Sequence, residues 1–286
     1  MIEAAFWSLV ACSALFIGAA IALRFDLSQR VIGLVMGFGA GVLIAALSVD
    51  LAVDAYGRSN GYVLALGLAA GGITFFVGDL LIDRKGGAHR KQSGGRQAEG
   101  NPLAIVLGTV LDGIPESAAI GVALVEGQGI GVAFVVAVFL SNLPESLAAT
   151  SGLHKAGRPA GRILGLWAVV TIVCTAAAVI AFGLLDDAQQ GLIAFILAFA
   201  AGGILAMLAD TMMPEAFEQA GKVVALVTVL GFALGFLIVA HEVEEAAPHA
   251  PVTVVTMAAG EPRRASVSLS EARRPTPPAG APLART

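Results

Sequence analysis

The feature that most constrains this chain is a series of long apolar stretches that recur along most of its length. A helix that crosses the hydrocarbon core of a bilayer needs about 20 mostly apolar residues. Eight stretches meet that length: 4–23, 31–55, 61–82, 102–125, 130–153, 163–185, 191–213 and 223–241. We therefore predict an all-α integral membrane protein, built as an eight-helix transmembrane bundle.

The composition supports a membrane protein and excludes several other classes. Hydrophobic residues make up 57% of the chain and charged residues 13%, whereas soluble domains carry about 25% charged residues. A net charge of −4 without an extended basic block argues against nucleic acid as a partner. Cys12 and Cys174 both lie in apolar stretches, so we interpret them as small buried residues and expect neither a disulfide framework nor a Cys-rich metal site.

The chain divides into a long apolar part and a short polar one. Residues 1–241 form the predicted transmembrane domain, whose longest connection is a Gly-, Lys- and Arg-rich loop at 84–101. Residues 242–286 are rich in Ala, Pro, Arg and Glu, which predicts a disordered C-terminal tail. The first apolar stretch has no basic leader before it, so we expect it to be retained as a helix and not removed as a signal peptide.

The charges of the connecting loops predict how the bundle is oriented. Alternate loops hold eleven Lys and Arg side chains, whereas the opposite set holds Arg58 alone. Basic loops stay on the cytoplasmic side of a membrane. We therefore expect a cytoplasmic loop at 84–101, both termini outside, and a location in the cytoplasmic membrane of a prokaryote.

Two pairs of segments repeat along the chain. Phe38–Ala55 aligns with Phe199–Ala216 without gaps at an offset of 161, and Leu111–Ala119 (LDGIPESAA) aligns with Leu140–Ala148 (LSNLPESLA) at an offset of 29. In the predicted topology the two members of each pair run in opposite directions. This pattern predicts inverted repeats, helices 1–3 against 6–8 and helix 4 against helix 5, an architecture that recurs in transporters.

Acidic residues lie deep inside the fourth and fifth predicted helices. Asp112 and Glu116 are spaced i,i+4, which places both carboxylates on one helix face. A charged side chain at mid-membrane costs about 2.5–3.5 kcal/mol on insertion scales, so it is functional by default. All Lys and Arg residues lie in loops, at helix ends or in the tail, so none is available at the same depth.

The fifth helix supplies further oxygen ligands beside these carboxylates, namely Ser141, Asn142 and Glu145. Each glutamate follows a proline, which frees a backbone carbonyl inside the helix. Several carboxylates in one buried place repel each other unless a cation balances them. We therefore predict a divalent metal site made of Asp112, Glu116, Ser141, Asn142 and Glu145. The alternative is that these groups bond neighbouring helices.

A second set of acids lies nearer the helix ends. Asp50 and Asp54 are spaced i,i+4 in the second helix, and Asp210 and Glu215 end the seventh. They are candidates for lining an ion pathway. They are equally compatible with ordinary polar residues at the membrane interface.

Together, the two Pro-Glu motifs, the eight helices with outward termini, the cytoplasmic loop and the PEA sequence of the seventh helix resemble the ZIP (Zrt/Irt-like) metal transporters over about residues 1–241. The family's H-N-x-P-E-G motif falls on Asp112–Ser117, and its second motif falls on Ser141–Ser146. The resemblance implies a metal site between helices 4 and 5, often binuclear, with the glutamates bridging the ions.

The chain departs from the family's motifs at several ligand positions. Asp112 stands where the family has histidine, Gly113 where it has asparagine, and Ser141 replaces another ligand; Asp210 aligns with a histidine of the seventh helix. The sixth helix lacks the carboxylate that some bacterial relatives carry, which argues for one metal position instead of two. A site without imidazole favours harder cations such as Mn²⁺, Fe²⁺ or Mg²⁺, although carboxylates also bind Zn²⁺.

These observations predict transmembrane transport of a divalent cation (Zn²⁺, Fe²⁺ or Mn²⁺), directed into the cytoplasm by analogy with the family. The metal is a substrate, no organic cofactor is expected, and the expected partners are metal ions, the lipid bilayer and a second copy in a homodimer. One alternative is a proton-coupled carrier that uses the same acids as a relay. An intramembrane protease is disfavoured because Phe76–Asp79 lacks the first glycine of G-x-G-D and H-E-x-x-H is absent; we expect no enzyme.

Overall fold

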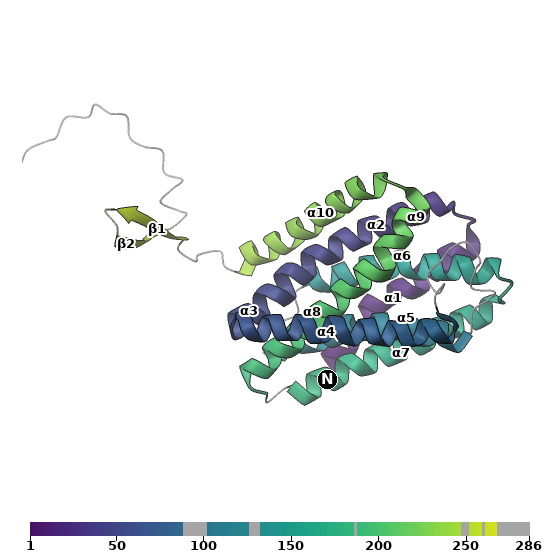
Figure 1. Cartoon of the computed structure of the whole chain (residues 1–286), viewed down its shortest axis with the longest axis horizontal. Helices are drawn as coiled ribbons and strands as arrows, with labels where there is room; N and C mark the ends of the chain where they lie inside the picture. Colours follow the sequence, from purple (N-terminus) through teal and green to yellow (C-terminus); the bar gives the residue numbers. More distant parts are fainter. Residues whose placement is uncertain (88–101, 126–131, 186–187, 247–251, 259–260, 268–286) are drawn as a thin grey trace, which may run out of the picture. The chain divides into compact units, whose positions relative to one another are not determined.

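The computed structural model describes residues 1–87, 102–125, 132–185, 188–246, 252–258 and 261–267. The chain forms two compact units, Met1–Ala240 and His241–Thr286. The helices, in chain order, are α1 (Ile2–Arg24), α2 (Gln29–Ala46), α3 (Asp54–Arg58), α4 (Gly61–Ile82), α5 (Pro102–Ala123), α6 (Val132–Lys155), α7 (Ala160–Leu185), α8 (Gln190–Met207), α9 (Met213–Ala220) and α10 (Val223–Ala246) (Figure 1). The π-helical segments that adjoin them are η1 (Leu47–Val53), η2 (Asp83–Gly87) and η4 (Leu208–Met212).

The first unit is the helical bundle that the apolar stretches predict. Seven helical spans in the described part of the chain are long and apolar enough to cross a membrane. α5 occupies the remaining predicted stretch, and the side chains at its start lie outside the described residues. An all-helical integral membrane protein with eight long helices is therefore confirmed.

Two of the spans are longer than predicted because short helices continue them. The second runs through η1 and α3 over Gln29–Arg58, and the seventh runs through η4 and α9 over Gln190–Ala220. At 1.5 Å per residue each is about 45 Å long, against about 30 Å for the hydrocarbon core. The predicted end of the seventh helix at 213 was wrong, because hydropathy falls at Pro214 and Glu215 while the backbone stays helical.

These two spans also share their internal construction. α2 and α8 are each 18 residues long, and each passes directly into a π-helical segment. The π segments begin at Leu47 and Leu208, the two positions that the sequence repeat aligns. The change from α-helical to π-helical winding thus occurs in both copies of the repeated sequence.

Helix ends form where side chains can satisfy the free backbone N–H groups. The hydroxyl of Ser28 accepts from the N–H of Val31 at the start of α2. The amide oxygen of Asn60 accepts from the N–H groups of Tyr62 and Val63 at the start of α4, separating it from α3. α9 ends at Gly221, whose φ of 68° lies in the left-handed region that glycine adopts without strain.

Glycines allow the closest helix contacts in the bundle. Gly71 of α4 meets the backbone carbonyl of Phe199 of α8, and Gly202 of α8 meets the carbonyl of Leu68. α2 and α10 make a similar pair, in which Gly231 meets the carbonyl of Phe38. Small residues at such crossings let backbones approach and gain van der Waals contact, which drives association where lipid removes the hydrophobic term.

The elements differ in how deeply they are buried, and this locates the centre of the bundle. Most residues of α6 and of the spans containing α2 and α8 are buried, whereas only a minority of the residues of α4, α7 and α10 is buried. Exposed apolar residues such as Leu226, Val229 and Phe236 on α10 are suited to contact with lipid. The polar motifs of α5 and α6 therefore lie inside the bundle and not on its outer surface.

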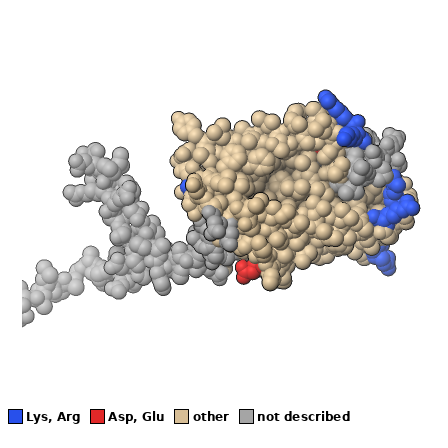
Figure 2. All heavy atoms as spheres, turned by 90° about the horizontal axis from the view of Figure 1, so that it is seen from below, with Lys and Arg blue, Asp and Glu red and all other residues tan. Residues whose placement is uncertain are grey.

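Basic residues gather at one end of the bundle, as Figure 2 shows from below. The loop and helix-end residues with described side chains at this end include Arg24, Arg30, Lys155 and Lys222, and Arg58 belongs to the opposite ends of the helices. The acids of the membrane interior are hidden from this view. The charge asymmetry that the sequence predicts is thus present on the folded surface.

The second unit contains one antiparallel pair of strands among its described residues. β1 (Val252–Ala258) pairs with β2 (Glu261–Val267), with Val252 opposite Val267 and Ala258 opposite Glu261. α10 continues to Ala246, beyond the predicted domain boundary at 241. The boundary and the disorder of the rest of the tail stay predictions.

Candidate metal centre

The two acids predicted on the fourth helix are buried in α5. Asp112 and Glu116 are each 1% exposed, and they lie one turn apart around Pro115 inside the helix. Pro115 packs against α8, where a Cβ added to Gly203 would lie 3.4 Å from the proline Cγ. The glycine thus lets α8 approach the turn of α5 that carries both carboxylates.

The polar residues predicted on the fifth helix are buried in α6 in the same way. Ser141, Asn142 and Glu145 are all buried, with Glu145 4% exposed. Pro144 of α6 packs against α2, where a Cβ added to Gly39 would lie 3.1 Å from the proline Cγ. Each Pro-Glu motif is therefore seated against a glycine of one long span.

A hydrogen bond joins the two motifs. The hydroxyl of Ser141 on α6 donates to Oε1 of Glu116 on α5 at 3.3 Å, inside the protein. The same hydroxyl is 3.0 Å from the carbonyl of Val138, the local acceptor available when it is not bonded to Glu116. A hydroxyl has one proton, so the two bonds alternate. Ser141 and Glu116, which are 25 positions apart in the sequence, are thereby held next to each other.

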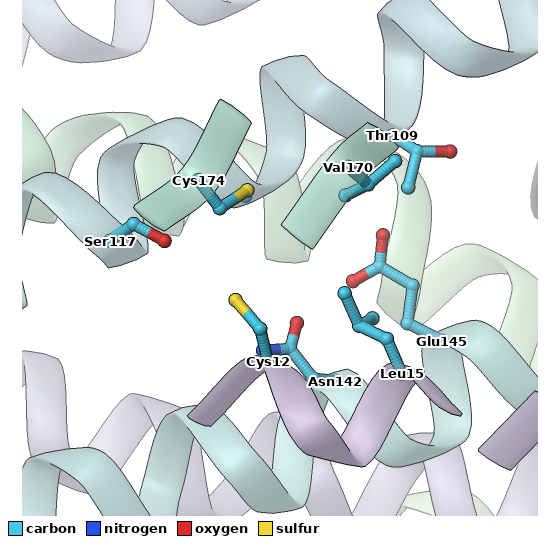
Figure 3. A pocket seen from close by; sticks show the side chains of 9 residues that line it. Cys12, Leu15, Thr109, Ser117, Asn142, Glu145, Val170 and Cys174 are labelled. Atoms are coloured by element: carbon cyan, nitrogen blue, oxygen red, sulfur yellow. The ribbon is translucent and has the colours of Figure 1, made fainter. Parts of the chain in front are cut away.

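Helix α1 also holds the motif of α6. The side-chain amide of Asn142 donates to the carbonyl of Ala11 at 3.4 Å, and the hydroxyl of Ser146 donates to the carbonyl of Ala14 at 3.4 Å. With its amide N–H engaged by α1, Asn142 keeps its side-chain oxygen for the interior (Figure 3). α1 therefore orients a predicted ligand.

A small cavity lies beside the two motifs (Figure 3). It has about 10 Å³ of space for the centre of a water-sized sphere, close to the minimum for one bound water. The residues that line it come from α1, α5, α6 and α7: Cys12, Leu15, Thr109, Gly113, Ser117, Asn142, Glu145, Val170 and Cys174. Of the predicted ligands, Asn142 and Glu145 reach this cavity.

The cavity also brings together the only two cysteines of the chain. Cys12 on α1 and Cys174 on α7 are buried free thiols, and both line this cavity (Figure 3). Gly113 makes room for this pair, because a Cβ there would lie 2.6 Å from Sγ of Cys174. The residue that departs from the family's asparagine thus faces a thiol.

In the described part of the chain, no three His, Cys, Asp or Glu side chains lie together closely enough to hold a metal ion. Glu116 is hydrogen-bonded to Ser141. Asn142 and Glu145 face the cavity, and Asp112 is buried one turn before Glu116. The five predicted ligands are therefore neighbours in two adjacent motifs, and their joint coordination of one ion stays a prediction.

The acids predicted to line a pathway occupy different surroundings. Asp50 lies in η1 and Asp210, which is exposed, lies in η4. Asp54 forms a 2.8 Å salt bridge with Arg58 at the end of its span. Glu215 is buried in α9 and accepts a hydrogen bond from Gln219. π-helical turns are frequent at functional sites, so Asp50 and Asp210 are the stronger candidates for a pathway among these four acids.

Sequence reasoning missed the contribution of α1 and α7. Cys12 and Cys174 line the cavity but belong to no recognisable motif. One signal was present: the separation of the two cysteines along the chain is within one residue of the offset between the long repeated segments. A repeat that superimposes α1 on α7 would have placed both thiols at equivalent positions.

The chain is distantly similar to a known protein. A protein of Arabidopsis thaliana described as a "putative zinc transporter" is 25% identical over 219 residues, which cover 76% of this chain and 35% of the relative. The chain thus spans about a third of that protein's length. No family model matches the chain. The resemblance to metal transporters drawn from the motifs agrees with this relationship.

Proposed function

We propose that this protein carries divalent metal ions across a membrane through a carboxylate site between α5 and α6, as a divergent member of the ZIP transporters. The observation that carries the proposal is the buried hydrogen bond between Ser141 and Glu116, which joins the two Pro-Glu motifs. The distant relationship to a protein described as a zinc transporter supports the same class of activity. We propose no enzymatic reaction.

The site works by replacing the water of a hydrated cation with fixed oxygen atoms. Buried carboxylates at Asp112, Glu116 and Glu145 are costly in a low-dielectric interior unless a cation balances them. A divalent ion offsets that cost and in turn loses its own hydration. Because the carboxylates come from separate helices, a small relative shift of α5 and α6 changes how many of them touch the ion.

We further propose that the bundle is an inverted repeat, with α2 matched to α8 and α5 matched to α6. Equal lengths of α2 and α8, with π-helical segments starting at aligned positions, support this assignment. The pairing of α4 with α8 through Gly202 has its counterpart in α10 with α2 through Gly41. Such repeats let one site open to either side of the membrane.

The test is metal uptake by the purified full-length protein in proteoliposomes. We expect wild-type vesicles to accumulate Zn²⁺ or Mn²⁺, and Glu116→Gln or Glu145→Gln to reduce uptake at least about tenfold, as expected for loss of groups that bind the metal. Glu218→Gln is the matched control, because Glu218 is an exposed carboxylate on α9, outside the motifs. It should retain uptake.

Two results would contradict the proposal. Wild-type vesicles could pass protons without accumulating any divalent ion, which would indicate a proton-coupled carrier of another substrate. Alternatively, the glutamine variants could fold and transport as well as Glu218→Gln does. Helical content and thermal unfolding of each variant establish that it is folded.

A further inference from the structure

We infer that Cys12 and Cys174 form a second cation position, specific for a thiophilic divalent ion of the Zn²⁺ class, beside the carboxylate site. The two thiolates are the primary ligands, and oxygen atoms of Asn142 and Glu145 complete the shell. No motif predicts this site, because α1 and α7 carry its thiols. The inference rests on the proposed function, since it names the class of ion that the transporter prefers.

Four helices converge on this position. Cys12 on α1 and Cys174 on α7 line one cavity, and Asn142 and Glu145 of α6 line it with them (Figure 3). The space within it, about 10 Å³, suits one ion or one water and not a larger ligand. The hydrogen bond from Asn142 to Ala11 leaves its side-chain oxygen available as a ligand.

The charges and atoms of the binding step balance without an oxidant or reductant. The two S–H bonds break, two metal–sulfur bonds form, and the two protons leave to water, while Glu145 stays ionised as a ligand. Two thiolates neutralise a divalent cation, so the buried complex carries no net charge from these three groups. A neutral complex avoids most of the cost of burying an isolated ion.

Thiols beside carboxylates would make the site selective among divalent ions. Thiolates favour Zn²⁺ over Mn²⁺ and Mg²⁺, which prefer oxygen ligands. Because the described residues contain no assembled group of three such ligands, Glu145 has to turn further into the cavity that it already lines. A soft position next to a carboxylate pair would therefore select Zn²⁺, a preference that the carboxylates alone would not give.

The experiment is Cd²⁺ binding to the full-length protein in lipid nanodiscs under reducing conditions. Cd²⁺ reports on thiolate ligands through their charge-transfer absorption in the ultraviolet. The chain has only two cysteines, so any such absorption comes from this pair. We expect wild type to develop the absorption, Zn²⁺ to abolish it by competition, and excess Mn²⁺ to leave it unchanged.

The single variants Cys12→Ser and Cys174→Ser should each weaken Cd²⁺ binding about tenfold or more, as expected for loss of a ligand. Ser13→Ala and Thr175→Ala, which alter the next residue of α1 and α7, are the matched controls and should keep the absorption. If the cysteine variants do not fold, the wild-type titration and its competition by Zn²⁺ and Mn²⁺ still decide the matter.

Absence of the absorption at saturating Cd²⁺, or displacement of Cd²⁺ by Mn²⁺ as readily as by Zn²⁺, would overturn the inference. Its failure differs from failure of the proposed function. Vesicle uptake that requires Glu116 but occurs without thiolate absorption refutes only the thiol site. Thiolate absorption in a protein that accumulates no metal refutes only the transport function. Glu116→Gln should lose uptake and keep the absorption.

Discussion

The hydroxyl of Ser141 on α6 donates a buried hydrogen bond to the carboxylate of Glu116 on α5, with 3.3 Å between Oγ and Oε1. This bond links the positions of the two Pro-Glu motifs, because Ser141, the first residue of the α6 motif, holds the carboxylate of the α5 motif. It also distinguishes Glu116 from Glu145, which lines the cavity with Asn142.

Removing that hydroxyl should weaken metal uptake. Ser141→Ala leaves a buried carboxylate without one of its donors, at a cost of about 1–3 kcal/mol. We expect a several-fold loss of uptake at low metal concentration, with Ser141→Thr retaining most of it because the hydroxyl remains. Initial uptake rates in proteoliposomes provide the measurement. Equal rates for the alanine variant and for Ser151→Ala, on the same helix, would contradict the expectation.

Exchanging the acid at position 112 should change which ion is preferred. Asp112 stands where the family carries histidine, so Asp112→His should raise Zn²⁺ uptake relative to Mn²⁺ uptake, since imidazole suits Zn²⁺ better than Mn²⁺. Asp112→Ala should weaken uptake of both ions, because it removes a charge and offers no new ligand. Competitive uptake of the two ions tests this. An unchanged ratio in the histidine variant, together with full transport by the alanine variant, would show that Asp112 is not a ligand.

The crossing of α4 and α8 should tolerate no side chain at its centre. A Cβ at Gly71 would collide with the backbone carbonyl of Phe199, which cannot rotate away. We expect Gly71→Ala to destabilise the protein by about 1–3 kcal/mol, the usual cost of overpacking. Gly165→Ala on α7 is the control, because nothing lies within 4 Å of a Cβ at that position. Thermal unfolding in detergent should show a lower midpoint for the first variant alone.

The orientation of the bundle can be tested by labelling single cysteines. In a Cys12→Ser/Cys174→Ser background, a cysteine at Ser59 should react with a membrane-impermeant thiol reagent in intact cells. One at Ser93, in the basic loop between α4 and α5, should react only after the membrane is opened. The physical reason is the retention of basic loops in the cytoplasm. Labelling of both positions from the same side would refute the proposed topology.

The helices of the bundle could be predicted because membrane insertion imposes a simple requirement. Each span must hide its backbone in about 20 apolar residues, and a count of apolar residues detects that. The count failed at Pro214 and Glu215, where the hydrophobic stretch ends but helix α9 continues to Ala220. The end of a hydrophobic stretch is not the end of a helix.

The candidate site could be predicted only where it has a local pattern. Asp112 and Glu116 are one turn apart in the sequence, so their burial on one helix followed from spacing. That Cys12 and Cys174 line one cavity depends on how α1 and α7 pack around α5 and α6. Gly113 leaves room for the Cys174 thiol there, and a single sequence does not state which helix a glycine will face.

The π-helical segment η1 has a consequence for the acids at the far end of its span. An α-helix turns by about 100° per residue, and that rule places Asp50 and Asp54 on the same face. In η1 the hydrogen bonds reach one residue further along the chain, from i to i+5, so each residue turns the chain by less. The residues of α3 (Asp54–Arg58) are therefore rotated about the helix axis relative to where a continuous α-helix from α2 would place them. Deleting one residue within η1 would restore α-helical winding and, with it, that placement.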